Sequence, residues 1–184
     1  MRFKYLQQMT VLLIGLTFGL ESMAYEEAYN KTPVDEIRVL TLPDARLIAT
    51  GTDGEYFDKS NNMFKRLFNY IRDNDVSMTV PVEGNLGQAQ MRFYLGSDAS
   101  PALDSTSEVQ IIELPERMVI SMGGKGSYNE KNINSVRAKL EASLESNKDL
   151  LPAGDPYVVF WNGPFTPWLF KRFDVHIPVT QVIQ

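Results

Sequence analysis

The feature that most restricts how this chain can fold is an internal repeat. Moving the sequence 72 residues along itself, without gaps, brings identical residues into register. The matched positions are Leu42-Pro43 with Leu114-Pro115, Ile48 with Ile120, Gly51 with Gly123, Gly54 with Gly126, Tyr56 with Tyr128, Lys59 with Lys131 and Asn62 with Asn134. Glycines that stay in step indicate one supersecondary unit in each copy. We therefore expect two similar halves, at about residues 36–96 and 108–180.

Both halves have the same order of expected elements. Alternating β-branched and apolar residues predict two strands around a proline turn, at residues 36–42 and 46–50 and again at 109–114 and 117–122. A glycine turn then leads into a helix. Two further strands follow each helix, at residues 77–82 and 90–95 and at 157–161 and 173–179.

The two expected helices each carry an apolar stripe. In the first, the stripe consists of Phe64, Leu67, Phe68 and Ile71, widened by Met63 and Tyr70. In the second, it consists of Ile133, Val136, Leu140 and Leu144. One half alone cannot bury both a sheet face and a helix stripe. The expected fold is therefore α+β, a distorted β-barrel built from two βαββ-type repeats and flanked by two helices.

The first 24 residues have the pattern of a cleavable signal peptide. Arg2 and Lys4 make the start positive, Val11–Leu20 is a short apolar run, and Ser22-Met23-Ala24 supplies small residues for cleavage. Ten apolar residues are too few to cross a bilayer as a helix, because a span takes about 20. We expect a periplasmic or secreted protein with no membrane span after cleavage and one domain at residues 25–184.

Charge and cysteine content exclude several classes of protein. The formal charge of the chain is −5, and there is no run of Lys or Arg, which argues against nucleic acid as a partner. The chain has no cysteine, so it has no disulfide and no cysteine-linked lipid. A single domain of this size does not need a disulfide to hold its core together.

Common catalytic and metal-binding motifs are absent from the sequence. There is no G-x-S-x-G, H-E-x-x-H or P-loop motif, and His176 is the only histidine. The stretch Gly123–Ser127 resembles a phosphate cradle, since glycine N–H groups can form an anion nest. In the first half, however, the position that corresponds to Lys125 is occupied by Asp53. A plain strand-to-helix turn is therefore the favoured interpretation.

Two stretches carry a resemblance to a known family. One is Asn62–Ile71 followed by Val76-Ser77-Met78-Thr79-Val80-Pro81-Val82, and the other is Trp161–Trp168 leading into Lys171-Arg172-Phe173-Asp174-Val175. Together they resemble the SOUL haem-binding protein family, over essentially all of residues 34–180. The resemblance implies a barrel of two βαββ-type halves that binds haem or a related tetrapyrrole. Gyrase-inhibitor-like effector-binding domains have the same fold and bind other small ligands, so the fold does not determine the ligand.

Haem needs an apolar slot and cations near its two propionates. The expected slot wall is Met63, Phe64, Leu67 and Tyr70, the expected lid is Phe165 and Trp168, and the expected propionate contacts are Arg66, Lys171 and Arg172. The competing interpretation is ordinary core packing, which we favour for Phe64, Leu67 and Phe68. For Met63, Tyr70 and Trp168 the two interpretations are equally good.

His176 is a possible axial ligand of the haem iron. Strand alternation places it on the same face as Arg172 and Asp174, opposite Phe173, Val175 and Ile177. That face is polar, so an exposed or Asp-paired histidine is the better expectation. Other candidate axial ligands are Met63, Met78 and Tyr70.

Three functions follow, in order of preference. The first is an exported, non-catalytic binding protein for haem or a related tetrapyrrole. The second is a binding module for another amphipathic small molecule. The third is a hydrolase that uses a pocket carboxylate such as Glu83, which a pKa raised by burial would support.

Overall fold

The computed structural model describes residues 26–163 and 165–182. The predicted signal peptide, residues 1–24, lies outside these described residues. Within them, the two halves of the chain have the same order of main elements: two strands, a helix and then further strands. The duplication itself stays an inference from the sequence.

All the predicted strands and helices are present. The first half contains β1 (Glu26–Glu27), β2 (Ile37–Leu42), β3 (Ala45–Gly51), α1 (Tyr56–Asp73), β4 (Thr79–Val80), β5 (Val82–Asn85) and β6 (Gln90–Tyr94). The second half contains β7 (Gln110–Leu114), β8 (Arg117–Lys125), α2 (Glu130–Ser146), β9 (Leu150–Pro152), β10 (Tyr157–Phe160), the short 3₁₀ helix η1 (Trp168–Phe170) and β11 (Arg172–Gln181). The predicted strand at residues 77–82 is divided between β4 and β5, because Pro81 has no N–H for a ladder bond.

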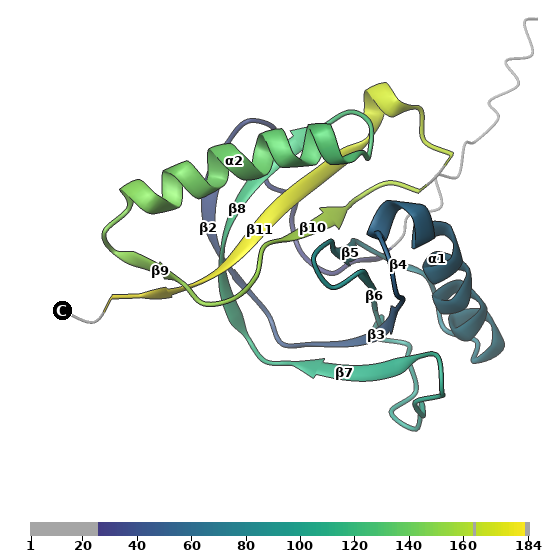
Figure 1. Cartoon of the computed structure of the whole chain (residues 1–184). Helices are drawn as coiled ribbons and strands as arrows, with labels where there is room; N and C mark the ends of the chain where they lie inside the picture. Colours follow the sequence, from purple (N-terminus) through teal and green to yellow (C-terminus); the bar gives the residue numbers. More distant parts are fainter. Residues whose placement is uncertain (1–25, 164, 183–184) are drawn as a thin grey trace, which may run out of the picture.

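Nine strands of the described chain form one curled sheet. The strand order is β2-β8-β11-β10-β5-β6-β3-β7, with β9 paired to the far end of β11. These pairs are antiparallel, and parallel pairing in the described residues consists of the separate two-residue pair of β1 with β4 and one isolated bridge between Val34 and Gly123. Figure 1 shows the sheet curling into a half-barrel with α1 and α2 flanking it. The fold class is the predicted one, α+β.

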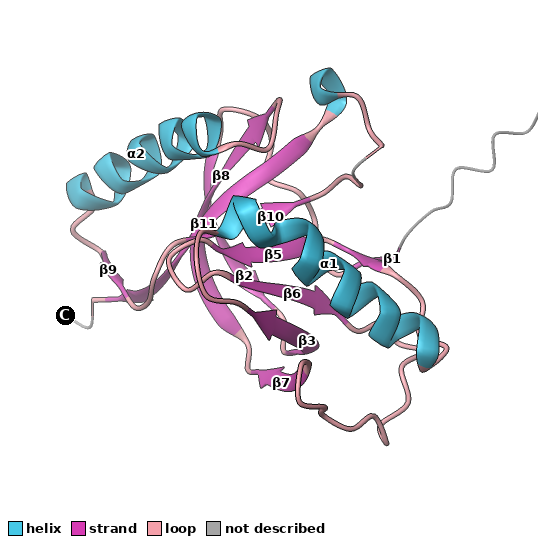
Figure 2. Cartoon of the chain, turned by 45° about the vertical axis from the view of Figure 1, so that its right-hand side comes forward, coloured by secondary structure: helices cyan, strands magenta, loops and turns pink. Residues whose placement is uncertain are grey.

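Both helices pack on the same face of the sheet. One buried cluster contains Met63 and Leu67 of α1, Ile133 and Leu140 of α2, and the strand residues that point towards the helices, such as Phe93. Figure 2 shows the two helices apart from each other, each over its own half of the sheet. We call this side the helix face and the opposite side the inner face.

The buried stripe of α1 differs from the predicted one. Met63, Leu67, Tyr70 and Ile71 are buried, whereas Phe68 is 42% exposed. The observed stripe also has i, i+4, i+7 and i+8 spacing, so it is an equally regular helical face, turned away from Phe68. The prediction of Phe68 as a core residue was therefore wrong. The predicted stripe of α2 is confirmed in full.

The matched glycines before the two helices have matching backbone angles. Gly54 has φ of 105° and Gly126 has φ of 104°. A side chain is strained in this region, so glycine suits the point at which each strand turns into its helix. In the stretch Gly123–Ser127, which was predicted as a turn, Gly123 to Lys125 are the end of β8 and the chain turns at Gly126.

Candidate functional site

The predicted slot wall on α1 is part of the packed core. Met63 and Leu67 have no exposed surface, and Tyr70 is 8% exposed. The Tyr70 hydroxyl donates to the carbonyl of Asp104 at 2.7 Å. These side chains fill the space between α1 and the sheet, so they give no open slot for a ligand.

The remaining α1 candidates lie at the edge of this core. Phe64 is half-buried, and its ring stacks on that of Phe68 at 5.9 Å and meets Phe93 edge-on at 5.2 Å. Arg66 donates to the carbonyl of Gly51 at 3.2 Å and lies 3.7 Å from a carboxylate oxygen of Glu108. Arg66 therefore helps to tie α1 to the neighbouring segments.

The predicted lid is an exposed apolar segment. Phe165 is 97% exposed, Trp168 60%, Leu169 62% and Phe170 70%. Few monomeric proteins leave several large apolar side chains side by side in water, because each contact with water has a free-energy cost. This segment, which we call the aromatic loop, spans residues 165–170 and includes η1.

The two basic residues after the aromatic loop have different roles. The Lys171 ammonium lies 4.8 Å from the centre of the Tyr128 ring. Arg172 donates from Nη2 to the carbonyl of Thr32 at 2.9 Å. Lys171 therefore contacts an aromatic ring, whereas Arg172 is bound to the segment that contains Thr32.

A hollow of about 400 Å³ adjoins the aromatic loop at the start of α2. Its lining residues are Lys125, Gly126, Ser127, Asn129, Lys131, Asn132, Ser135 and Trp168. The side chain of Asn129 caps the helix by accepting from the N–H of Asn132 at 3.0 Å. Two lysines and one exposed indole therefore meet at the positive end of a helix.

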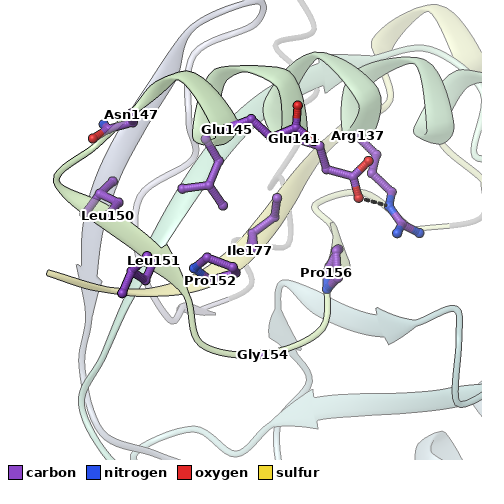
Figure 3. A pocket seen from close by; sticks show the side chains of 11 residues that line it. Arg137, Glu141, Glu145, Asn147, Leu150, Leu151, Pro152, Gly154, Pro156 and Ile177 are labelled. Atoms are coloured by element: carbon purple, nitrogen blue, oxygen red, sulfur yellow. Dashed lines mark hydrogen bonds and ion pairs between the residues drawn. The ribbon is translucent and has the colours of Figure 1, made fainter. Parts of the chain in front are cut away.

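A second hollow, of about 450 Å³, lies under the C-terminal end of α2. Figure 3 shows the paired side chains of Arg137 and Glu141 on one side of it and Leu151, Pro152 and Ile177 on the other. None of the predicted site residues lines this hollow. Neither of the two hollows lies beside residues 63–70.

His176 lies on the inner face, and it is completely buried. The face is the predicted one, since Phe173, Val175 and Ile177 point to the helix face. The expectation of an exposed histidine was wrong, and Asp174 Oδ2 lies 4.0 Å from its Nε2 atom, which is too far for a hydrogen bond. Its Nδ1 atom lies 3.1 Å from the Tyr157 hydroxyl. Burial, with Arg117 nearby, lowers the pKa of His176 to about 3, so the imidazole is neutral.

Glu83 is the centre of a buried polar group on the same inner face. Its carboxylate accepts from the Tyr94 hydroxyl and from Arg117 Nη2 at 2.9 Å, and Arg92 Nη1 lies 3.6 Å away. Arg117 Nη2 also donates to the Tyr94 hydroxyl at 2.7 Å. Two guanidinium groups and a hydroxyl therefore surround this carboxylate, and the geometry places Glu83 as an ion-pair partner of Arg117.

Asp174 joins the inner face to the N-terminal segment. Its Oδ2 atom accepts from the backbone N–H of Thr32 at 3.0 Å and from Trp161 Nε1 at 2.9 Å. Burial raises the pKa of Asp174 to about 6, although these two hydrogen bonds oppose the shift. The Thr32 hydroxyl also lies 2.5 Å from that of Ser121.

The inner-face group was not recognised from the sequence, apart from Glu83 and His176. Its members are scattered over β5, β6, β8, β10 and β11, and they meet only because neighbouring strands place them side by side. A usable signal was present in the alternation Tyr157-Val158-Val159-Phe160-Trp161 and Phe173–Ile177, where polar or aromatic residues recur on one side. That side was expected to face water, because the segment that covers it had not been assigned.

Membrane-spanning helices and metal-binding clusters are not found in the part of the chain that the structure describes. No helix there is long and apolar enough to cross a membrane. No group of three or more His, Asp or Glu side chains within residues 26–163 and 165–182 is arranged to hold a metal ion.

Comparison with solved structures shows a shared fold. The chain superposes on the EcmrR C-terminal domain with a TM-score of 0.65 and 11% identity, covering 80% of this chain and 98% of that one. It superposes on a hydrolase from Listeria innocua with a TM-score of 0.52 and 13% identity, covering 81% and 94% of the two chains. At such low identity the likeness extends to the fold alone.

Comparison of the sequence with family models gives a more specific result. A search of curated protein sequences gave no match. The model that describes the SOUL heme-binding protein family matches residues 20–178, a span that includes both stretches with the predicted resemblance. Since this match covers most of the chain, the protein belongs to the SOUL heme-binding protein family.

Proposed function

We propose that this protein is an exported, non-catalytic binding protein for haem or a related tetrapyrrole. The observation that carries the proposal is the match to a haem-binding family over residues 20–178. A tetrapyrrole of this type is a flat apolar ring with carboxylate side chains. Its binding surface therefore needs apolar contact area beside a few cations.

The aromatic loop and the hollow beside it offer both components. Phe165 and Trp168 are open to solvent, so contact with a flat ring removes apolar surface from water. Lys125 and Lys131 line the adjoining hollow, and Lys171 follows the loop directly. In this arrangement the ring lies against the loop and the carboxylates point to the lysines at the start of α2.

This proposal differs from the predicted slot in the part played by α1. Met63 and Leu67 are fully buried, and Tyr70 is engaged with Asp104, so the ring lies outside the core. His176 is also fully buried on the other side of the sheet from the helices. The proposed binding mode therefore uses apolar contact and charge, without His176 as an axial ligand.

Export is proposed on the sequence of residues 1–24 alone. A positive start, a short apolar run and small residues before Tyr25 are the features that a signal peptidase uses. Expression of the full chain in a bacterial host, followed by mass spectrometry of the periplasmic fraction, tests this. A mature protein that begins at Tyr25 supports export, and an intact chain retained in the cytoplasm contradicts it.

The binding proposal is tested by titrating haemin and metal-free protoporphyrin IX into the purified mature protein. We expect a shifted Soret band with haemin. We also expect dissociation constants for the two compounds within about tenfold of each other, because a single axial ligand bond is not part of the proposed mode. Spectra identical to those of the free porphyrins at micromolar concentration contradict the proposal.

Matched variants locate the surface. Trp168→Ala is expected to raise the dissociation constant by at least about tenfold, as truncation of an aromatic binding residue does. Leu151→Ala is the control, because Leu151 is 54% exposed but lies at β9, away from the loop. Lys125→Glu with Lys131→Glu is expected to weaken binding and Lys148→Glu to leave it unchanged. Equal effects of all these variants contradict the proposed surface.

A further inference from the structure

The inner face of the sheet is walled by aromatic rings from several strands. The Tyr29 ring lies among them, 5.7 Å from Tyr94 and 5.4 Å from Trp161, both edge-on, and 5.9 Å from His176. The three neighbours come from β6, from the end of β10 and from β11, whereas Tyr29 comes from the segment before β2. A single ring from outside the sheet therefore occupies a cage that the sheet provides.

The segment that carries Tyr29 spans residues 26–35 and has only short stretches of backbone pairing among the described residues. β1 pairs with β4 outside the nine-stranded sheet, Ala28 donates to the carbonyl of Val80 at 2.8 Å, and Asp35 donates to that of Gly123 at 2.9 Å, beside an isolated bridge at Val34. Thr32 is bound at Asp174 and Arg172, and the Lys31 ammonium lies 5.0 Å from the centre of the Trp161 ring. Gly123 permits this close approach, since a Cβ there would lie 2.4 Å from the carbonyl oxygens of Thr32 and Pro33.

Hydrogen-bonding capacity is left unused around this ring. The Tyr29 hydroxyl, Arg117 Nη1 and His176 Nε2 are buried without a hydrogen-bond partner, and so are Arg172 Nε and the Oδ1 atom of Asp174. A buried polar atom without a partner costs about 1–3 kcal/mol, so such atoms are rare in folded proteins. Five of them on the inner face indicate that Tyr29 fits the space of the cage but does not satisfy its polar groups.

The charges around the cage favour an anionic group. The groups that the sheet itself contributes are three cations, Arg92, Arg117 and Arg172, and two carboxylates, those of Glu83 and Asp174. Arg117 binds Glu83 through Nη2, whereas its Nη1 atom has no hydrogen-bond partner. An incoming carboxylate can therefore bind Nη1 without displacing Glu83. A cation in the same place would meet the guanidinium groups of Arg92 and Arg117.

We infer that the inner face is a second ligand site, for a small planar aromatic anion, and that Tyr29 takes the place of the ligand's ring while the site is closed. The site lies on the opposite side of the sheet from the helices and goes beyond the proposed tetrapyrrole surface. Ligand binding displaces residues 26–35, the ring enters between Tyr94 and Trp161, and the anionic group is bound by Arg117.

The test uses three probes of one shape: benzoate, benzamide and benzamidine, which are anionic, neutral and cationic. Trp168→Phe leaves Trp161 as the only tryptophan, so its fluorescence reports the cage. With Tyr29→Ala added, we expect benzoate to bind at least about tenfold more tightly than to the protein with Tyr29, because no internal competitor remains. Benzamide is expected to bind less tightly and benzamidine least.

Arg117→Met in the Tyr29→Ala background is expected to remove the preference for benzoate over benzamide. Circular dichroism and thermal unfolding confirm that each variant is folded. If folded Tyr29→Ala binds benzoate no better than the parent, or prefers benzamidine, the inference is overturned.

Limited proteolysis of the unaltered mature protein gives a measurement that needs no substitution. Trypsin cleaves after Lys31, which lies in the covering segment. Benzoate is expected to accelerate this cleavage in proportion to its occupancy, while benzamide at equal concentration has a smaller effect. Unchanged cleavage at millimolar benzoate, together with no gain in binding in any folded Tyr29 variant, overturns the inference.

Discussion

The two faces of the sheet are buried in different ways. The helix face carries Ile48, Phe93, Val158, Phe173 and similar apolar side chains, which pack against the stripes of α1 and α2. The inner face carries Glu83, Asp174, His176 and several aromatic rings, and a short N-terminal segment covers part of it. One face is therefore held by apolar burial and the other by a network of polar contacts.

This difference indicates which face is specialised for folding and which is free to serve a function. Apolar packing is a stable solution that needs no specific partner. Burying charged groups is costly, and a well-packed apolar replacement of an ion pair is often as stable. The polar inner face therefore adds little to stability that leucine and valine would not add, which is consistent with a role in binding.

The largest effect is expected from truncation on the helix face. Leu67→Ala is expected to lower the free energy of unfolding by about 3–4 kcal/mol, because Leu67 is fully buried and the change leaves a cavity. Phe68→Ala one position along is the control, and its cost is expected to be about 1 kcal/mol or less because Phe68 is 42% exposed. Urea unfolding measures both. Equal losses would show that α1 packs through a different side.

A smaller loss is expected from breaking the inner-face ion pair. Arg117→Met leaves Glu83 with the Tyr94 hydroxyl and the more distant Arg92, and the expected loss is about 3 kcal/mol. Adding Glu83→Gln to Arg117→Met is expected to restore part of this loss, since the buried negative charge is then gone. Urea unfolding at pH 7 measures the cycle. A double variant no more stable than the single one contradicts the description of this group as a charge network.

The next effect depends on pH and comes from His176. Its pKa is lowered to about 3 by burial, from 6.5, so the folded state keeps it neutral while the unfolded state binds a proton as the pH falls. This histidine therefore contributes most stability above pH 6.5 and loses that contribution towards pH 3. From pH 7 to pH 5, wild type is expected to lose about 2 kcal/mol relative to His176→Gln.

Asp174 shifts stability in the opposite direction, since its pKa is raised to about 6. Its contribution is fully present below its unfolded value of 3.8 and is lost as the pH rises through 6. The test is therefore the difference between His176→Gln and wild type, with Asp174 present in both. A difference that does not change between pH 7 and pH 5 contradicts a neutral buried His176.

Much of the helix face was predictable from the sequence, because the apolar periods of strands and helices report burial directly. The stripe of α2 and the alternation Phe173, Val175 and Ile177 were predicted as observed. The rotation of α1 about its axis was not predictable, since Met63, Leu67 and Ile71 form as regular a stripe as Phe64, Leu67 and Phe68. Only the shape of the sheet beneath the helix decides between the two.

The inner face was less predictable because its cover is not periodic. Residues 26–35 have neither helical nor strand alternation, so nothing in them indicates burial. Without that cover, His176 and Asp174 look like the solvated side of an edge strand. The aromatic loop was predicted as a candidate contact by its composition, but its distance from Met63 and Leu67 depends on the tertiary fold.

The smallest expected effect concerns the Tyr29 hydroxyl, and it has the opposite sign to the others. Tyr29→Phe removes a buried polar atom that has no partner and leaves the ring in its cage, so stability is expected to stay unchanged or rise by up to about 1 kcal/mol. Tyr94→Phe is the matched control. It removes a hydroxyl that donates to Glu83 and accepts from Arg117, and it is expected to lower stability by about 1–2 kcal/mol. Thermal unfolding of the two variants separates a hydroxyl that the fold uses from one that it leaves free. A loss in Tyr29→Phe as large as that in Tyr94→Phe would mean that Tyr29 belongs to the polar network, and the inner face would then be a closed structural core.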